Sequence, residues 1–540
     1  MSSSQILHAE RESKRALGSA LHPAGFVLPL MLLALGFILR MVNAVYRFLN
    51  PDEVLHYLLS VAPSVRVAEH ASLTTSHPPL LIIFLYYWRM LGHPEWLLRL
   101  PHVLAGTAFC WVMFVWLRRV TNQGTALIGL ALWLFSPTLI QMSAEVRQYA
   151  FLLLFSSLSL YFLEKGIAQD SPWSTLFSAL TLYLALLVHY AALIVALTLG
   201  IYALMRWKGA PTSVSARLTW IGGQLGAIAV IAGLFVHHVS KLRARGQPQE
   251  VAETYARRSI FWPGEEHAWT FVGRNTVRIF HYFFNQGAVG VLALLLFICG
   301  IALLVRSNHQ VSSRKPSSRQ LAFLFVLPFA VNSITGLLQL YPYGGSRHDV
   351  YLAMFAMPAI SVPLAVWKPK WRWLKPLALA IILAVSNLFP APLAEYLRFR
   401  DQNRKLMTSA LASLRALPAD AIIFTDDQGG MMLSYYLCNK RVVQIEQEPP
   451  APFFKERCGD QWVISLDPRL WIFRAETFPD SFERMRNRYG LGEGTPLWFF
   501  QSGWYIDREV ALREELKGYG CSAPHSFGRN IFLCQIEAGR

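Results

Sequence analysis

Residues 24–57 read AGFVLPLMLLALGFILRMVNAVYRFLNPDEVLHY, an apolar run followed at once by two carboxylates, Asp52 and Glu53. A helix needs roughly 20 apolar residues to span a bilayer, and this run is long enough. Carboxylates at the mouth of such a helix are costly to hold near lipid, so function is the first hypothesis. The alternative is a helix start, because Pro51 and the two acidic residues suit a first turn.

The composition extends this interpretation to the whole chain. Of 540 residues, 54% are hydrophobic and 15% are charged, whereas roughly 25% are charged in soluble proteins. The net charge of +17 would suggest nucleic acid in a soluble protein, but here the cations lie between apolar runs, as membrane topology requires. We expect a polytopic α-helical membrane protein without a nucleic-acid partner, whose surplus charge suits membrane lipids and an anionic lipid substrate.

The apolar runs predict about eleven transmembrane helices. The first should be a retained signal anchor, because no cleavage-site pattern follows it. The run 78–91, about 14 residues long, is too short to span and is predicted to be an interfacial or re-entrant helix. The predicted spans lie at about 24–46, 100–117, 124–139 and 149–164, on both sides of His189-Tyr190, at about 218–237 and 287–305, before 341, and at about 349–367 and 374–390.

Basic residues fall on alternate loops together with the N-terminus, and the positive-inside rule makes that side cytoplasmic. The segments 47–99, 238–286, 341–348 and everything after about 391 then face outward. We therefore predict a cell inner-membrane protein with its site and C-terminal domain in the periplasm. The outer loop 238–286 is itself basic, which indicates either a function for its cations or a long solvated loop.

Two domains are predicted, a transmembrane module over residues 1–390 and a soluble α/β domain over 391–540. In the second, 406–417 and 431–437 favour helices, and 421–425, 462–466 and 530–536 favour strands. Asp427-Gln428-Gly429-Gly430 resembles a phosphate loop only faintly, and without a glycine-rich or Walker pattern no nucleotide site is expected.

Four of the six cysteines lie in this outward domain, where an oxidising compartment favours disulfides. Proximity favours Cys438–Cys458 and Cys521–Cys534 but does not settle the pairing. Cys110 and Cys299 lie in predicted spans, where inert packing is expected.

Polar residues on the predicted outer loops are the candidate site. Asp52 could be a general base, and Glu53 could orient it, bind substrate or share a divalent metal, although no clear set of metal ligands is present. The arginines could hold a lipid phosphate through bidentate contacts. The candidate substrate contacts are His56, His77, Glu145, Arg147, Tyr149, His189, Arg257, Arg258, Arg347 and His348.

Each candidate has a structural alternative. His77 could be a loop histidine before a proline turn, and His189 a residue of a helix turn. Glu145 and Tyr149 could form an interfacial turn with an aromatic anchor. Arg257-Arg258 and Arg347-His348 could contact lipid headgroups or solvent. All lie on the same predicted face, and this agreement favours the functional interpretation.

The order of these motifs resembles the polyprenyl- or dolichyl-phosphate-sugar glycosyltransferases. The resemblance rests on Asp52-Glu53, His77-Pro78-Pro79-Leu80, Leu98-Arg99-Leu100-Pro101, Ser136-Pro137, Glu145-x-Arg147-x-x-Ala150 and His189-Tyr190. It covers about 25–205 well and the Arg347 turn moderately. These enzymes include the family 39 protein O-mannosyltransferases and the lipid A aminoarabinose transferase, and they share the GT-C fold.

The resemblance implies a glycosyltransferase that moves a sugar from a polyprenyl-phosphate donor to a lipid, glycan or protein acceptor. Asp52 would deprotonate the acceptor in an inverting displacement, with Glu53 placing acceptor or donor. Arg347, Arg257 and Arg258 would hold the leaving phosphate, and Arg40 matches a basic position upstream of the acidic pair. The rival interpretations are a flippase or transporter of polyprenyl-linked sugars and a non-catalytic membrane scaffold.

Overall fold

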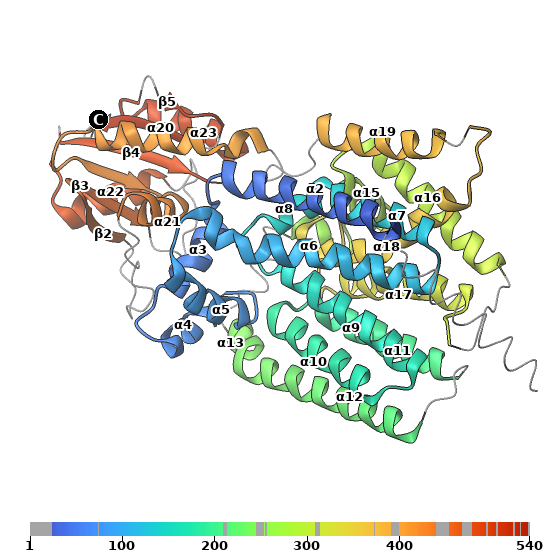
Figure 1. Cartoon of the computed structure of the whole chain (residues 1–540). Coiled ribbons are helices and arrows are strands. Elements are labelled where there is room, and N and C mark those ends of the chain that lie inside the picture. Colours follow the sequence, from blue (N-terminus) through green and yellow to red (C-terminus); the bar gives the residue numbers. More distant parts are fainter. Residues whose placement is uncertain are drawn as a thin grey trace, which may run out of the picture.

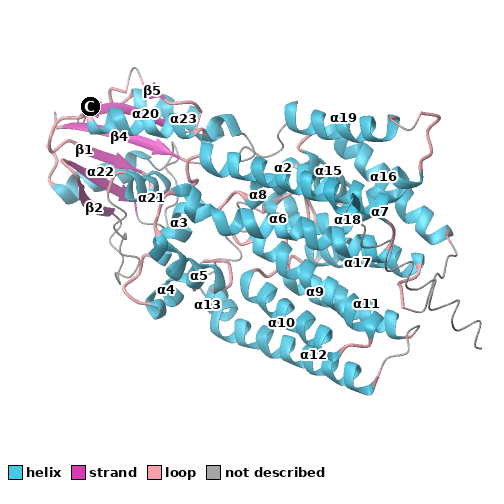
Figure 2. Ribbon diagram, viewed as in Figure 1, coloured by secondary structure: helices cyan, strands magenta, loops and turns pink. Residues whose placement is uncertain are grey.

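The structure, a computed structural model, consists of a bundle of long helices with a mixed α/β domain at one end (Figures 1 and 2). It describes residues 24–537 except 74, 209–212, 245–252, 254–255, 308–313, 372, 390–398, 439–452, 467–477, 493–494, 504–505, 522–523 and 530. The basic N-terminal segment and the predicted domain boundary at 390/391 lie outside the described residues.

Seven helical stretches among the described residues are long and apolar enough to cross a membrane. They are α2 (Ala24–Tyr46), α6 (Glu95–Val120), α9 (Tyr149–Gln169), α12 (Val214–Leu234) with its extension η2 (Phe235–Val239) and α13 (Ser240–Ala244), α16 (Gly287–Arg306), α17 (Ser318–Leu337), and η4 (Arg347–Leu352) with α18 (Ala353–Val366). The helices α7 (Gln123–Phe135) and α8 (Pro137–Ser143) form an eighth if this pair, bent by 61° at Ser136-Pro137, is one span.

Three shorter apolar helices stand where further spans are predicted, namely α10 (Pro172–Val188), α11 (Ala192–Trp207) and α19 (Leu374–Leu388). The multi-pass helical fold is thus confirmed, while the count of eleven stays a prediction that needs these three to cross. The run 78–91 forms a short helix, α5 (Leu80–Trp88), with one 3-10 turn, η1 (Arg89–Leu91).

Burial separates the helices of the bundle centre from those of its rim. Within their apolar windows, 67% of the α6 residues and 78% of the η4–α18 residues are buried. The corresponding values are 17% for α2 and 11% for α12, whose apolar side chains are therefore left to face lipid.

Short helices cover one end of the bundle. The first predicted outer loop forms α3 (Pro51–Ser60), α4 (Val65–Ser72) and α5, and the second contains η3 (Arg257–Ser259) and the amphipathic helix α15 (Ala268–Phe284). This end adjoins the α/β domain, where α21 (Asp427–Tyr436) packs against α3 (Figure 1).

The α/β domain contains a sheet of six strands in the order β2-β3-β1-β4-β6-β5. The central strand β1 runs parallel to β3 and β4, and the outer pairs are antiparallel. The strands are β1 (Ile422–Thr425), β2 (Phe453–Cys458), β3 (Gln461–Leu466), β4 (Pro496–Ser502), β5 (His525–Ser526) and β6 (Ile531–Glu537), and the remaining helices are η6 (Phe399–Gln402), α20 (Arg404–Arg415), α22 (Phe478–Tyr489) and α23 (Ile506–Lys517).

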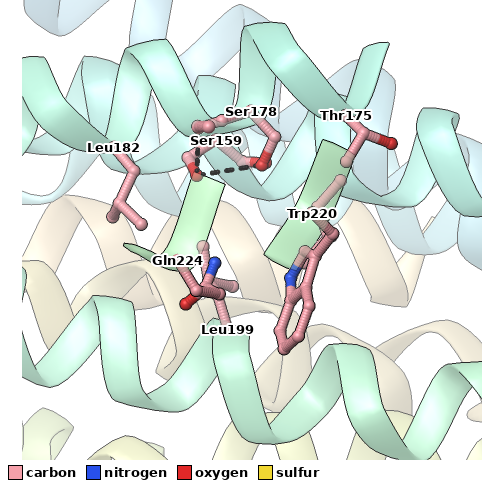
Figure 3. A pocket seen from close by; sticks show the side chains of 9 residues that line it. Ser159, Thr175, Ser178, Leu182, Leu199, Trp220 and Gln224 are labelled. Carbon is pink, nitrogen blue, oxygen red and sulfur yellow. Dashed lines mark hydrogen bonds between the residues drawn. The ribbon is translucent and has the colours of Figure 1, made fainter. Parts of the chain in front are cut away.

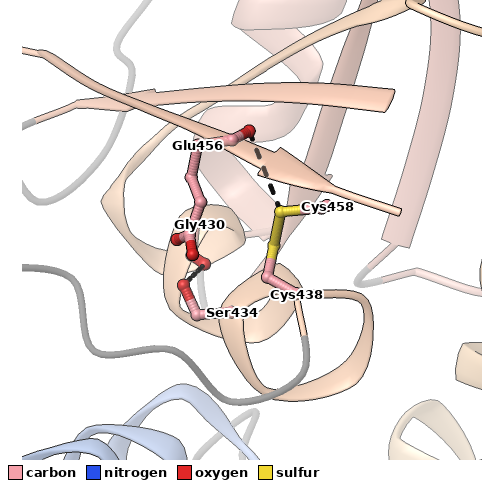
Figure 4. The surroundings of a disulfide bond; sticks show 5 residues. All are labelled: Gly430, Ser434, Cys438, Glu456 and Cys458. Atoms are coloured by element: carbon pink, nitrogen blue, oxygen red, sulfur yellow. Dashed lines mark hydrogen bonds between the residues drawn. A yellow bond between two sulfur atoms is a disulfide. The ribbon is translucent and has the colours of Figure 1, made fainter. Parts of the chain in front are cut away.

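The three predicted strands and two predicted helices of this domain are confirmed as β1, β3, β6, α20 and α21. Both disulfides favoured by proximity, Cys438–Cys458 and Cys521–Cys534, are present. Cys438 follows the last turn of α21, so the first disulfide ties that helix end to β2 (Figure 4).

The spans are less purely apolar than the sequence pattern suggested. Arg206, in the last turn of α11, is 1% exposed and pairs with Glu164 of α9 at 3.0 Å. Tyr202 donates to the same carboxylate at 2.6 Å. Nearby, Ser159 and Ser178 bond to each other beside a small cavity that Trp220 and Gln224 also line (Figure 3).

Candidate functional site

The helix α3 holds the acidic pair in a fixed position. Asn50 caps it by accepting from the Glu53 N–H at 3.0 Å, and the Glu53 carboxylate accepts from the Asn50 N–H at 3.0 Å. This reciprocal capping box fixes where the helix begins. The helix-start interpretation is therefore correct for both acidic residues, since both lie in the first turn, and Glu53 also closes the capping box.

Glu53 is fully buried and its carboxylate is engaged on all sides. Arg99 of α6 donates from Nε to Oε1 at 2.8 Å and from Nη2 to Oε2 at 2.6 Å. The Val146 N–H donates to Oε1 at 2.8 Å. Glu53 thus connects α3, α6 and the segment that follows α8, and it has the contacts of a positioning group.

Asp52 has a different environment and lies at the centre of a cationic site. Its Oδ2 pairs with both Arg147 and Arg347, the latter at 2.6 Å. The Asp52 side chain is 20% exposed and that of Arg347 is 23% exposed, whereas Arg147 is 3% exposed. The three residues come from three distant parts of the chain, and the site is accessible on the side of Asp52 and Arg347.

The two arginines control the charge of Asp52. Burial raises the pKa of this carboxyl, but Arg147 and Arg347 outweigh it and hold the pKa well below its ordinary value. Asp52 is therefore ionised at any physiological pH, and its basicity is low while both guanidinium groups pair with it.

Histidine and tyrosine rings stand around this centre. The ring of His77 lies 6.3 Å from that of His56, 5.2 Å from that of His189 and 6.4 Å from that of His348. Tyr149 contacts the ring of His189 at 5.3 Å. We call these five residues with Asp52, Arg147 and Arg347 the Asp52 cluster.

These histidines are neutral groups in a cationic surrounding. Burial and then Arg147 lower the pKa of His56 to about 3, and the same causes with Arg347 lower the pKa of His189 to about 3. Burial and neighbouring rings, that of His189 first, hold the pKa of His77 well below its usual value. The imidazoles can therefore offer hydrogen bonds without adding charge.

The proton of His189 has a defined position. The Ala191 N–H donates to His189 Nδ1 at 3.0 Å, so the neutral ring carries its proton on Nε2. No described residue accepts from that Nε2, although the ring is 1% exposed. A buried donor without a protein acceptor, beside two arginines, is suited to an anionic ligand.

Arg347 is presented by a rigid turn. Asp349 accepts from Ser346 Oγ at 2.9 Å and from Asn332 of α17 at 2.7 Å. Gly345 has φ +61°, and a Cβ there would lie 2.5 Å from the Arg278 carbonyl oxygen, so only glycine fits without strain. The turn therefore determines the direction of Arg347.

Glu145 lies behind the centre and is 2% exposed. It pairs with Arg47 at 3.4 Å and accepts from Gln141 at 2.8 Å. Its neighbour Arg147 turns to Asp52, and Arg147 Nη2 is 3.5 Å from the Tyr149 hydroxyl. The segment 145–149 thus contributes Arg147 and Tyr149 to the cluster directly and Glu145 as support.

The structure does not bring the other predicted arginines into the cluster. Arg40 is buried and donates to the carbonyls of Trp133 and Leu134 at the end of α7, a contact that ties α2 to the bent pair. Arg257 and Arg258 are exposed, and Arg257 pairs with Glu265 at 2.6 Å. Their segment nevertheless supports the Arg347 turn, because the Tyr343 N–H donates to the Ser259 carbonyl at 2.7 Å.

The histidines do not match a metal centre in this arrangement. Their rings are partly stacked, and no three of their ring nitrogens lie within 4.8 Å of one another. Within the described part of the chain, the one group of three ligand residues that meets this distance is Cys438, Glu456 and Cys458, and its two sulfurs form a disulfide.

Sequence reasoning did not assign to the site several residues that support the cluster, above all Arg47, Asp349 and Arg99, the last of which it named only as part of a motif. Each is an ionisable residue at or inside an apolar span, and each is at most 1% exposed. This position was the signal that could have identified them, because such residues are rare unless they have a partner.

Comparisons with known proteins bear on the family and on the fold of the chain. Residues 76–237 match the model of the dolichyl-phosphate-mannose-protein mannosyltransferase family. The structure is similar to ArnT from Cupriavidus metallidurans in the apo state, with a TM-score of 0.53 at 12% identity over 94% of this chain and 97% of that chain. The chain has an ArnT-like fold. The similarity to ArnT bound to undecaprenyl phosphate has a TM-score of 0.52 at 12% identity, over 95% and 98% of the two chains.

No curated protein matches the chain by sequence. The predicted resemblance is thus confirmed by a family model for part of the transmembrane region and by the fold of nearly the whole chain. At 12% identity the structural likeness establishes the fold alone.

Proposed function

We propose that this chain is a membrane glycosyltransferase that moves a sugar from a polyprenyl-phosphate donor to a lipid, glycan or protein acceptor. The observation that carries the proposal is one partly exposed carboxylate, Asp52, bridged by Arg147 and Arg347. A carboxylate can accept a proton, and two guanidinium groups can hold a phosphate. The matching family and the solved ArnT complex name lipid-linked phosphates, which supports this class of donor.

In the proposed reaction the acceptor hydroxyl or amine attacks the anomeric carbon while Asp52 takes its proton. The bond between that carbon and the phosphate oxygen breaks, and polyprenyl phosphate leaves with the electron pair, so the configuration inverts. Arg147 and Arg347 hold the phosphate, and the Nε2–H of His189 donates to it. Glu53 acts as a positioning residue, which among the three roles expected from the sequence favours the orientation of Asp52.

Donor binding would also activate the base. While both arginines pair with Asp52 alone, they lower its pKa and its basicity. A bound phosphate would share their charge, and the pKa of Asp52 would rise towards that of an ordinary carboxyl. The base would thus become effective when the donor is in place, on the face that we propose to be periplasmic.

The decisive experiment measures release of polyprenyl phosphate from a panel of lipid-phosphate sugars with envelope acceptors. We expect release by the wild type, a loss of about a hundredfold or more in Asp52→Asn, and no loss in the control Asp420→Asn, whose carboxylate is 68% exposed in the α/β domain. Equal release by wild type and Asp52→Asn would remove Asp52 from the mechanism. No release from a broad panel would favour the flippase or the scaffold.

A further inference from the structure

The α/β domain reaches the segment that leads into the proposed base. The Tyr436 hydroxyl, at the end of α21, accepts from the Leu49 N–H at 2.8 Å and donates to Glu95 at the start of α6. Tyr436 belongs to the soluble domain, and Leu49 lies directly before the Asn50 cap of α3. One hydroxyl group thus connects the domain to the chain entering the helix of Asp52.

Further contacts hold the same short segment. The Phe48 N–H donates to the Gln402 carbonyl at 3.0 Å, and Arg47 forms an antiparallel bridge with Asn403. From the transmembrane side, Arg99 donates to the carbonyls of Arg47 and Phe48 at 2.6 and 2.9 Å. Residues 47–49 are therefore clamped between α6 and the α/β domain.

The clamping surface is itself rigid. Tyr435 donates to the His93 carbonyl at 2.7 Å and packs edge-on against Tyr57 of α3 at 5.2 Å. The disulfide of Cys438 ties the same helix end to β2. Arg404 of α20 pairs with Glu95 at 3.3 Å, so the carboxylate that accepts from Tyr436 is also held by the domain.

We propose that Tyr436 is a positioning residue through which the α/β domain places Asp52 between Arg147 and Arg347. The proposal rests on the proposed function in naming Asp52 the base. The geometric part of it does not, because the clamp on residues 47–49 exists whatever the chain does. A shift of the segment would move Asp52 within its pair of arginines, and small displacements of a reacting group cost rate.

The test compares Tyr436→Phe with the wild type, Asp52→Asn and the matched control Tyr519→Phe, a tyrosine of the same domain that packs against Phe478 and Phe482. For Tyr436→Phe we expect kcat to fall about tenfold while the KM for the donor changes by less than about twofold. Tyr519→Phe should keep the wild-type values. A wild-type kcat in Tyr436→Phe, with Asp52→Asn inactive, would overturn the positioning role and leave the proposed function standing.

Two readouts separate positioning from mere loss of folded protein. In Tyr436→Phe, Asp52 would lose part of its contact with Arg147 and Arg347, and the pKa of its carboxyl would rise. The acid limb of the rate profile should therefore move to higher pH. His56 and His348, the other titratable groups beside Asp52, stay in place. Hydrogen exchange in the peptide covering residues 47–57 should become faster in Tyr436→Phe and stay unchanged in Tyr519→Phe. This measurement does not depend on turnover, so unchanged exchange overturns the proposal even if no donor is found.

A second pair of variants covers the case in which Tyr436→Phe does not fold. Removing Cys438–Cys458 by double alanine substitution loosens the end of α21, whereas removing Cys521–Cys534 leaves that end tied. We expect faster exchange in residues 47–57 for the first pair and wild-type exchange for the second. Equal effects of the two pairs would contradict the proposal.

Discussion

A single carboxylate oxygen, Oδ2 of Asp52, pairs with both Arg147 and Arg347, which lie far apart in the sequence. The pairing makes Asp52 a weak base until another anion takes up part of the positive charge. The contributions of the two arginines can be measured separately, because Arg147 is nearly buried and Arg347 is partly exposed. The proposed roles of base and phosphate holder can therefore be tested one residue at a time.

Replacing Arg347 by glutamine should shift the pH dependence of activity. Arg347 lowers the pKa of Asp52, so its removal raises that pKa. The ionised form is the active base, and hence the acid limb of kcat/KM should move to higher pH, measured as release of polyprenyl phosphate. Arg274→Gln, which removes a half-exposed partner of Glu266, is the matched control. An unchanged acid limb would show that Asp52 does not titrate in that limb.

Replacing His189 by phenylalanine should weaken the hold on the leaving phosphate. The phenyl ring preserves contacts with Tyr149 and His77 but lacks the Nε2–H that no described residue accepts. A lost hydrogen bond to a charged group corresponds to a roughly ten- to hundredfold fall in kcat/KM for the donor. His525→Phe, a stacked ring in the α/β domain, should change nothing. Full activity of His189→Phe would assign the histidine to packing.

At the scale of elements, the helix α3 is held at its first turn. The capping box with Asn50 fixes its start, and Arg99 of α6 holds Glu53 in a fully buried ion pair. Removing one partner of a buried pair leaves an uncompensated charge, which is far more costly than losing a surface pair. The position of the cluster therefore depends on α6 as much as on the loop that carries it.

Glu53→Gln should lower the free energy of unfolding and leave the affinity for the donor largely unchanged. We expect a loss of about 3 kcal/mol, because Arg99 keeps its charge in a buried site. The control Glu265→Gln breaks an ion pair whose side chains are 51% and 56% exposed, and it should cost about 1 kcal/mol or less. Thermal unfolding of both variants in the same detergent measures the difference. Similar melting temperatures would contradict the structural role of Glu53.

At the scale of the whole molecule, the α/β domain and the Asp52 cluster lie at the same end of the helix bundle (Figure 1). The direct contacts of Gln402, Asn403 and Tyr436 with residues 47–49 mean that both face the same side of the membrane. The positive-inside pattern predicts that this side is the periplasm.

Labelling of single cysteines tests that orientation. In a background without Cys110 and Cys299, an impermeant maleimide should label Asp420→Cys in intact spheroplasts. Ser213→Cys, at the opposite end of the bundle before α12, should be labelled only after permeabilisation. The reverse pattern would invert the topology, and labelling of both in intact cells would contradict the predicted number of crossings between them.

The sequence by itself determined the class of fold and most of the site's composition. Span length, basic loops and the order of the motifs are local patterns, so they can be recognised from the sequence alone. They correctly indicated helical spans, the α/β domain and both disulfides, and they named every ring of the Asp52 cluster. They also named Asp52, Arg147 and Arg347, which the structure brings into contact.

Only the tertiary structure decided which partners each of these residues meets and how deeply it is buried. Asp52 and Glu53 are adjacent in the chain, yet one faces two arginines at an accessible site and the other is locked to Arg99. Arg40 and Arg257 have the same charge as Arg347, but Arg40 donates to the Leu134 carbonyl and Arg257 pairs with Glu265. The clamp of Tyr436 on residues 47–49 joins segments that no local pattern connects. Charge and spacing are properties of the sequence, whereas burial and partners arise only when distant helices pack together.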